Sequence, residues 1–226
     1  MESGKLAVLE VNWEEQILKK ELSRSVRPFL NGLEGELGVD FLEGEFNTRD
    51  DLVMGLREFK KSKAKLLYVG AHGVRKMLFD TSHGVNAATI IGACRNSKGK
   101  GYFFSACDFG NRNTAREFLS QTKADFVVGY SGPVPWLESS LVDLFFLSYF
   151  LQGRVKRRKG PKEGKVTLLE TRYDFLAQGS RDPIKLAHWV YEDVPLALVL
   201  GFDVYILETG QGKKAKVVCA SDTWKQ

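Results

Sequence analysis

Short apolar runs alternate along this chain with helix-length segments, and this alternation restricts the fold more than any other feature. The runs are rich in Leu, Val, Phe and Tyr and span residues 6–11, 39–46, 66–71, 101–106 and 126–130. Helical apolar spacing or helix-capping residues mark the segments between and after them, at residues 14–33, 48–60, 86–94, 112–121 and 136–152. Strands and helices in this order predict an α/β fold with a mostly parallel sheet, covered by helices on both faces.

The pattern changes after Gly153. A basic stretch comes first, then a helix-like segment at 166–178, and then short apolar runs at 196–200, 204–207 and 217–219. We expect these three runs to be late strands that extend the sheet in antiparallel fashion. Residues 1–226 are interpreted as a single domain, with a core at 1–153 and an extension of the sheet at 154–226.

Positive charge is concentrated in the basic stretch, residues 154–165 (RVKRRKGPKEGK). The chain has a net charge of +5, yet outside this stretch it carries 26 basic and 27 acidic residues. We expect an exposed, mobile loop here. A nucleic-acid surface is the alternative, but no aromatic side chains interleave the charges as platforms for single strands require. We therefore expect no nucleic-acid partner.

Cysteine usage and the lack of long apolar segments bear on compartment and cofactors. The three cysteines form no CxxC pair, and their spacing to the three histidines does not resemble a zinc site. An odd cysteine count without a signal peptide favours a reducing cytoplasm. No segment reaches the roughly 18 apolar residues of a membrane span, and the run at 141–151 is interrupted by Asp143. We expect no metal, no cofactor and no membrane association.

Two reactive side chains each follow an apolar run directly. His72 comes after residues 66–71, and Cys107 comes after residues 101–106. The carboxyl ends of parallel strands meet at one edge of a sheet, where ligands bind, so we expect the imidazole and the thiol to lie within reach of each other. The pair predicts a cysteine hydrolase, and a peptidase in particular.

Competing interpretations exist for the other cysteines and histidines. A free cysteine is usually a small buried hydrophobe, which we expect for Cys94 and Cys219. His83 begins a second His-Gly pair but follows a turn-like stretch, and His188 lies between apolar residues where a structural role is expected.

Two features near Cys107 are expected to have opposite effects on the stability of its thiolate. A helix predicted to begin near residues 111–113 would favour a thiolate through its dipole. Asp108 would oppose the thiolate if its carboxylate were close and ionised.

The order of these motifs resembles that of caspase-like cysteine peptidases. A strand ending in His72-Gly73 is followed by one ending in Ser105-Ala106-Cys107, by VVGYSGPVPW at 127–136 and by an apolar helix containing FFLSYFLQG. Within that clan the chain looks closest to the CHAT branch, related to separases and caspases. The resemblance covers residues 64–153, is loose before them and fades after them. The caspase signature Q-A-C-[RQG]-G is not met, which excludes a caspase proper and leaves aspartate specificity unsupported.

The resemblance implies a three-layer caspase-like sandwich and a set of residue roles. Cys107 is implied as the nucleophile, and His72 as the general base that later protonates the leaving amine. The backbone N–H groups of Gly73 and Cys107 are implied as the oxyanion hole. The implied substrate-binding residues follow the first and fifth strands: Asn12, Trp13, Ser131, Val134 and Trp136.

These features favour a cytoplasmic cysteine endopeptidase that acts on a protein or peptide through a thioester acyl-enzyme. The alternative is a caspase-like interaction or regulatory module that cleaves little, with a regulatory protein as partner. The presence of both members of the Cys–His pair favours the enzyme. Trp136 could instead pack its helix on the sheet. Glu14, Glu15 or Asp80 could bind a basic residue before the scissile bond (P1), and the sequence does not select among them.

Overall fold

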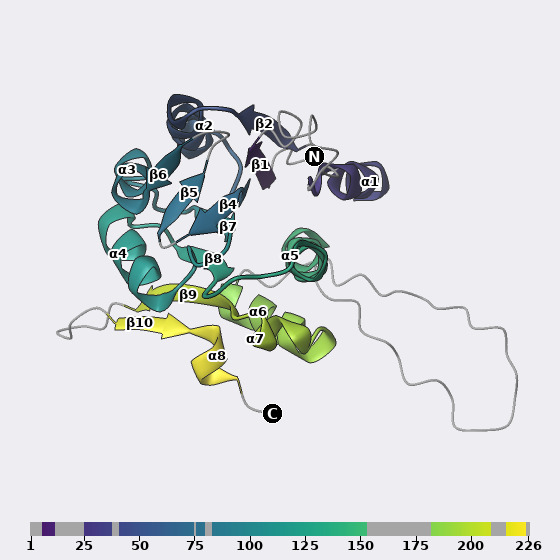
Figure 1. Cartoon of the computed structure of the whole chain (residues 1–226). Helices are drawn as coiled ribbons and strands as arrows, with labels where there is room; N and C mark the ends of the chain where they lie inside the picture. Colours follow the sequence, from purple (N-terminus) through teal and green to yellow (C-terminus); the bar gives the residue numbers. More distant parts are fainter. Residues whose placement is uncertain are drawn as a thin grey trace, which may run out of the picture.

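A seven-stranded sheet forms the centre of the computed structural model, which describes residues 6–11, 25–37, 41–74, 76–79, 83–152, 182–208 and 216–224 (Figure 1). The strand order is β10-β9-β8-β7-β3-β1-β2. Parallel pairing joins β1 (Leu6–Val11), β2 (Leu42–Phe46), β3 (Leu66–Gly70), β7 (Gly101–Ser105) and β8 (Phe126–Tyr130). The late strands β9 (Phe202–Glu208) and β10 (Lys216–Cys219) are antiparallel. This arrangement confirms the expected mostly parallel α/β sheet with an antiparallel addition.

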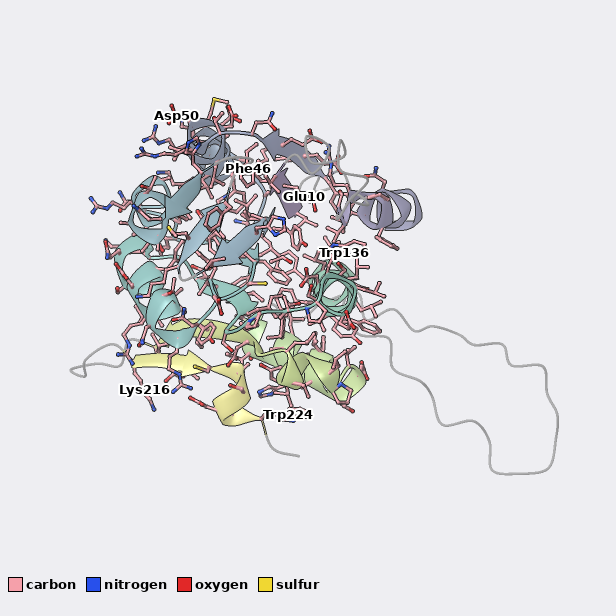
Figure 2. The ribbon with its side chains drawn as sticks, in the orientation of Figure 1. Glu10, Phe46, Asp50, Trp136, Lys216 and Trp224 are labelled. Atoms are coloured by element: carbon pink, nitrogen blue, oxygen red, sulfur yellow. The ribbon has the colours of Figure 1, made fainter. Side chains whose placement is uncertain are left out.

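Helices cover both faces of the sheet (Figure 1). On one face lie α2 (Arg49–Lys61), α3 (Ala87–Ala93) and α4 (Arg112–Thr122). On the other lie α1 (Arg27–Leu37), α5 (Trp136–Gln152) and α6 (Pro183–Asp193), with the short α7 (Leu196–Val199) and α8 (Ala220–Thr223) beside α6. Each face buries its own apolar cluster; Phe46 lies inside the first, whereas Asp50 lies on the outer surface of α2 (Figure 2).

A small antiparallel sheet directly follows strand β3 of the central sheet. Only Ala71 separates β3 from β4 (His72–Val74), which pairs with β5 (Met77–Phe79), which pairs in turn with β6 (Gly84–Asn86). Leu78 and Val85 from this sheet are fully buried in the cluster beneath α2, α3 and α4. His72 therefore lies at the junction of the two sheets.

Local sequence signals explain where the helices begin. Thr48 caps α2 through the backbone N–H of Asp51, whose carboxylate in turn accepts from the backbone N–H of Thr48. Such a reciprocal capping box satisfies N–H groups that have no partner inside the helix. Asn86 and Asn111 cap α3 and α4 in the simpler one-way form. Pro28 occupies the second position of α1, where a missing N–H is tolerated.

The structure corrects one predicted strand and leaves some segments undescribed. Residues 196–200 were expected as a strand, but Leu196–Val199 forms α7. Pro195, at the N-terminus of α7, adopts helical backbone angles. Val199 is 81% exposed while Ala197 is buried, as expected for one helical turn at the surface. Of the helix expected at 14–33, residues 14–24 lie outside the described residues, residues 25–26 are not helical, and α1 begins at Arg27. The basic stretch and the 166–178 segment also lie outside the described residues. None of the described helices is long and apolar enough to cross a membrane.

Candidate active site

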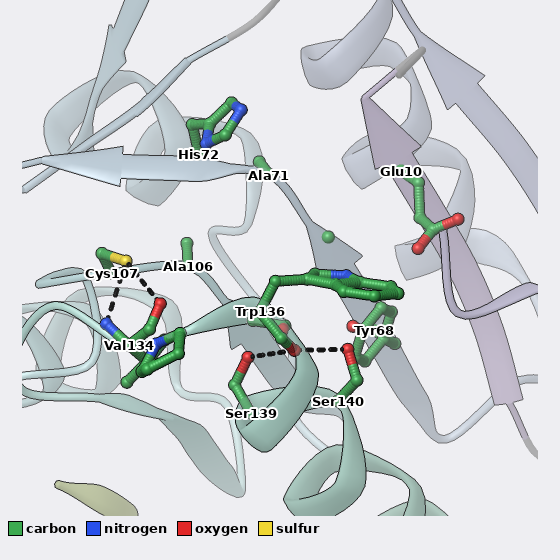
Figure 3. A pocket seen from close by; sticks show the side chains of 13 residues that line it. Glu10, Tyr68, Ala71, His72, Ala106, Cys107, Val134, Trp136, Ser139 and Ser140 are labelled. Carbon is green, nitrogen blue, oxygen red and sulfur yellow. Dashed lines mark hydrogen bonds between the residues drawn. The ribbon is translucent and has the colours of Figure 1, made fainter. Parts of the chain in front are cut away.

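A pocket opens where the strand order of the sheet reverses. β1 pairs with β2 on one side and with β3 on the other, and the chain leaves β1 toward β2 but leaves β3 toward β7. Ligand crevices of open α/β sheets form at the carboxyl ends of strands at such a reversal. The pocket has a volume of about 300 Å³ and is lined by Glu10, Tyr68, Gly70, Ala71, His72, Ser105, Ala106, Cys107, Val134, Pro135, Trp136, Ser139 and Ser140 (Figure 3).

The loop that follows β7 holds Cys107 in place. Phe109 is buried, with its ring centroid 4.7 Å from that of Phe104. Asp108 takes a left-handed φ of 59°, and its N–H donates to the carbonyl oxygen of Gly132 at 3.2 Å. Gly110 is required by space, because a Cβ there would lie 2.3 Å from the carbonyl carbon of Gly129. The loop is therefore locked onto the end of β8.

The sulfur of Cys107 is hydrogen-bonded to the backbone of Val134. The Val134 N–H donates to Sγ at 3.4 Å, and the Val134 carbonyl oxygen accepts from the thiol at 3.9 Å. An N–H group can donate to a thiol or to a thiolate, whereas the carbonyl can accept only from the protonated thiol. Val134, in the segment between β8 and α5, thus positions the sulfur in either protonation state.

The turn from β3 into β4 brings His72 and Gly73 to the same pocket end as Cys107. Gly73 is packed so closely that a Cβ on it would lie 2.1 Å from the carbonyl oxygen of Cys107 and 2.9 Å from its nitrogen. In Figure 3 the imidazole of His72 projects away from the Cys107 sulfur, although both lie on neighbouring segments. Catalytic hydrogen bonds are often absent in unliganded sites and form when substrate binds.

Beneath the pocket lies a buried carboxylate on α5. Asp143 is 1% exposed and accepts hydrogen bonds from Tyr68 Oη (2.9 Å), Tyr130 Oη (2.6 Å) and Ser105 Oγ (2.5 Å). Burial raises the pKa of Asp143 to about 6. Burial and this neighbouring acid raise the pKa of both tyrosines, which therefore remain protonated donors. The network ties β3 and the carboxyl ends of β7 and β8 to α5.

A second buried carboxylate, Glu10 on β1, lines the pocket at the end opposite Cys107 (Figure 3). It is 1% exposed and accepts from the hydroxyl of Ser25 and from the N–H of Val26 at 3.1 Å. Burial raises the pKa of Glu10. Gly70 makes room for it, since a Cβ at that position would lie 3.0 Å from Glu10 Oε1.

The structure places two of the predicted substrate-binding residues at the pocket and a third away from it. Val134 and Trp136 line the pocket, and the carbonyl of Trp136 accepts from the hydroxyls of Ser139 (3.0 Å) and Ser140 (2.8 Å). Ser131 is exposed, is not among the lining residues, and its N–H donates to the carbonyl of Gly201 at 3.0 Å. The remaining residues weighed for substrate binding lie outside the described part of the chain: Asn12, Trp13, Glu14, Glu15 and Asp80.

The other histidines and cysteines lie away from the pocket. His83 is exposed and does not line it. Nε2 of His188 is bonded to the carbonyl of Ala220 (3.1 Å) and the hydroxyl of Thr223 (3.0 Å), as befits the expected structural role. Cys94 and Cys219 are fully buried, as expected of packing residues. Within the described residues, no group of three potential metal ligands is present.

Sequence reasoning missed the polar lining of the pocket. Glu10, Tyr68, Ser105, Ser139 and Ser140 were not predicted as site residues, yet all face the cavity. One signal was available: Glu10 is the single charged residue in an otherwise apolar strand. A charge in a strand buried on both faces is costly unless it serves a site or a partner.

Neither a protein-family model nor a curated protein matches this sequence. Any assignment of function therefore depends on the residues and geometry of this pocket.

Proposed function

We propose that this chain is a cytoplasmic cysteine endopeptidase with a caspase-like three-layer sandwich fold, closest to the CHAT branch of that clan. One observation carries the proposal. A histidine and a cysteine that follow the adjacent parallel strands β3 and β7 line one pocket at the reversal of the strand order, with Gly73 packed against the backbone of Cys107. This proximity supports a thiol nucleophile with a nearby base and an oxyanion site.

Hydrolysis would proceed in two stages. His72 accepts the proton of the Cys107 thiol, the thiolate attacks the scissile carbonyl carbon, and the N–H groups of Gly73 and Cys107 stabilise the oxyanion. The amine leaves with the proton from His72, and a thioester remains on Cys107. Water, deprotonated by His72, then attacks the thioester and releases the acid and the free thiol. The first step requires the His72 ring to turn toward the sulfur.

A second candidate is an interaction module that binds peptides in this pocket and cleaves little. The hydrogen bonds of the sulfur to Val134 and the orientation of the His72 ring favour it. In that case the pocket would bind a segment of a regulatory partner without forming a thioester.

The two candidates are separated by incubation with a mixed peptide library and identification of the products by mass spectrometry. The peptidase predicts new termini with wild type, their loss with Cys107→Ala, and their retention with Cys94→Ala. Saturable binding of peptides by wild type without any new termini would favour the interaction module instead.

A further inference from the structure

We propose that the pocket beside Cys107 binds the side chain of an arginine or lysine at P1, with its cationic group at Glu10. The proposal rests on the peptidase function above and names the substrate class of that same site.

The position of Glu10 relative to the thiol carries the inference. When the scissile carbonyl lies at Cys107, the P1 side chain is the part of the substrate that must enter the adjoining pocket. Figure 3 shows the sulfur at one end, the carboxylate of Glu10 at the other, and the indole of Trp136 extending between them above Tyr68. A long side chain with a charge at its tip matches this arrangement.

Within the described residues, no cation is hydrogen-bonded to Glu10. Its hydrogen-bond donors are the neutral Ser25 hydroxyl and Val26 N–H. Arg27 attracts the Glu10 carboxylate electrostatically, but its guanidinium is paired with two carboxylates of β2, Glu43 and Glu45. A carboxylate accepts about four hydrogen bonds, so acceptor capacity remains for a ligand. Among the described lining residues none is Lys or Arg, and a buried carboxylate with no cation bonded to it favours a cationic ligand.

The walls of the pocket suit the rest of such a side chain. The aromatic faces of Trp136 and Tyr68 can cover an aliphatic stem and attract a cation. Ser139 and Ser140 donate their hydroxyl hydrogens to the Trp136 carbonyl, which leaves their oxygens as acceptors. An acidic P1 residue would meet the charge of Glu10, with Asp143 lying below, and like charges in a desolvated site repel strongly.

The test compares four peptides that differ only at P1, carrying arginine, lysine, citrulline or glutamine. Citrulline keeps the shape of arginine without its charge. We expect wild type to have a kcat/KM for the arginine and lysine peptides about 10²-fold above that for their neutral counterparts, the worth of one hydrogen-bonded charge pair.

Glu10→Gln should abolish this preference, so that the arginine and citrulline peptides are cleaved with a similar kcat/KM. The amide oxygen of Gln can still accept from Val26. Glu58→Gln is the matched control, because Glu58 lies on α2, is exposed and does not line the pocket. It should retain the wild-type preference.

A measurement on wild type alone covers the case in which Glu10→Gln fails to fold. Butylguanidinium should slow alkylation of Cys107 by iodoacetamide, whereas the neutral butylurea should not. Equal protection by the two compounds would overturn the proposal.

The remaining outcomes distinguish this proposal from the peptidase function. Cleavage after neutral or acidic residues, or an arginine preference that survives in Glu10→Gln, would overturn the cationic P1 site and leave the peptidase standing. Hydrolysis of no peptide would overturn the peptidase function and, with it, the P1 assignment.

Discussion

Replacing Gly73 with alanine should impair both catalysis and stability. The new Cβ would lie 2.1 Å from the carbonyl oxygen of Cys107 and 2.9 Å from Cys107 N and Ala106 Cβ. Non-bonded carbon contacts normally stay near 3.5 Å, so β4 and the Cys107 loop must separate by about 1 Å. A misplacement of that size costs about 10²-fold in rate, and overpacking of this kind costs about 1–3 kcal/mol of stability.

The assay pairs kcat/KM on a cleaved peptide with the free energy of unfolding in urea. Gly92→Ala is the control, because Gly92 has no atom within 4 Å of the new Cβ and lies inside α3. It should keep wild-type turnover and gain about 0.5–1 kcal/mol, the usual effect of alanine for glycine inside a helix. Wild-type turnover in a folded Gly73→Ala protein would refute the close packing of β4 on Cys107 as a catalytic requirement.

Three further predictions follow from the same geometry. Iodoacetamide at pH 8 should modify Cys107 before the two buried cysteines, whose thiol pKa values burial raises to about 12 and about 11; modification of all three at one rate would contradict this. His72→Ala should lower the rate about 10²–10⁴-fold and His83→Ala much less, and the reverse order would refute the assignment of the base. Between pH 4 and 6, wild type should lose up to about 3 kcal/mol of stability as pH rises, because the pKa of Asp143 is about 6 when folded and near 3.8 when unfolded. Asp143→Asn should lose less stability than wild type over this range in urea titrations, and identical pH slopes would contradict the burial argument.

The parallel part of the fold was predictable because its signals are local. Strands buried on both faces are continuous apolar runs, and capping residues such as Thr48 and Asn111 mark where helices begin. The run at 196–200 misled because five apolar residues fit a surface helical turn as well as a strand. The helical backbone angles of Pro195, seen only in the structure, distinguish the helical turn from the strand.

The candidate site was predictable only in part. His72 and Cys107 could be identified in the sequence because each directly follows a predicted strand, and the structure places both in one pocket. The contact of Val134 with the sulfur depends on how the loop after β8 folds back, which no spacing encodes. Glu10 lines the pocket because β1 lies beside β3 in the sheet. The order of the strands in the sheet cannot be read from local sequence patterns.

Covalent mapping of the nucleophile tests the central claim most directly. A peptidyl acyloxymethyl ketone, which alkylates cysteine peptidases through their own mechanism, is incubated with wild type and with His72→Ala, and the modified residue is located by tandem mass spectrometry. We predict stoichiometric modification of Cys107 in wild type, with a rate that drops at least about 10²-fold in His72→Ala. Modification of another residue, or an equal rate in the two proteins, would contradict a Cys107–His72 peptidase.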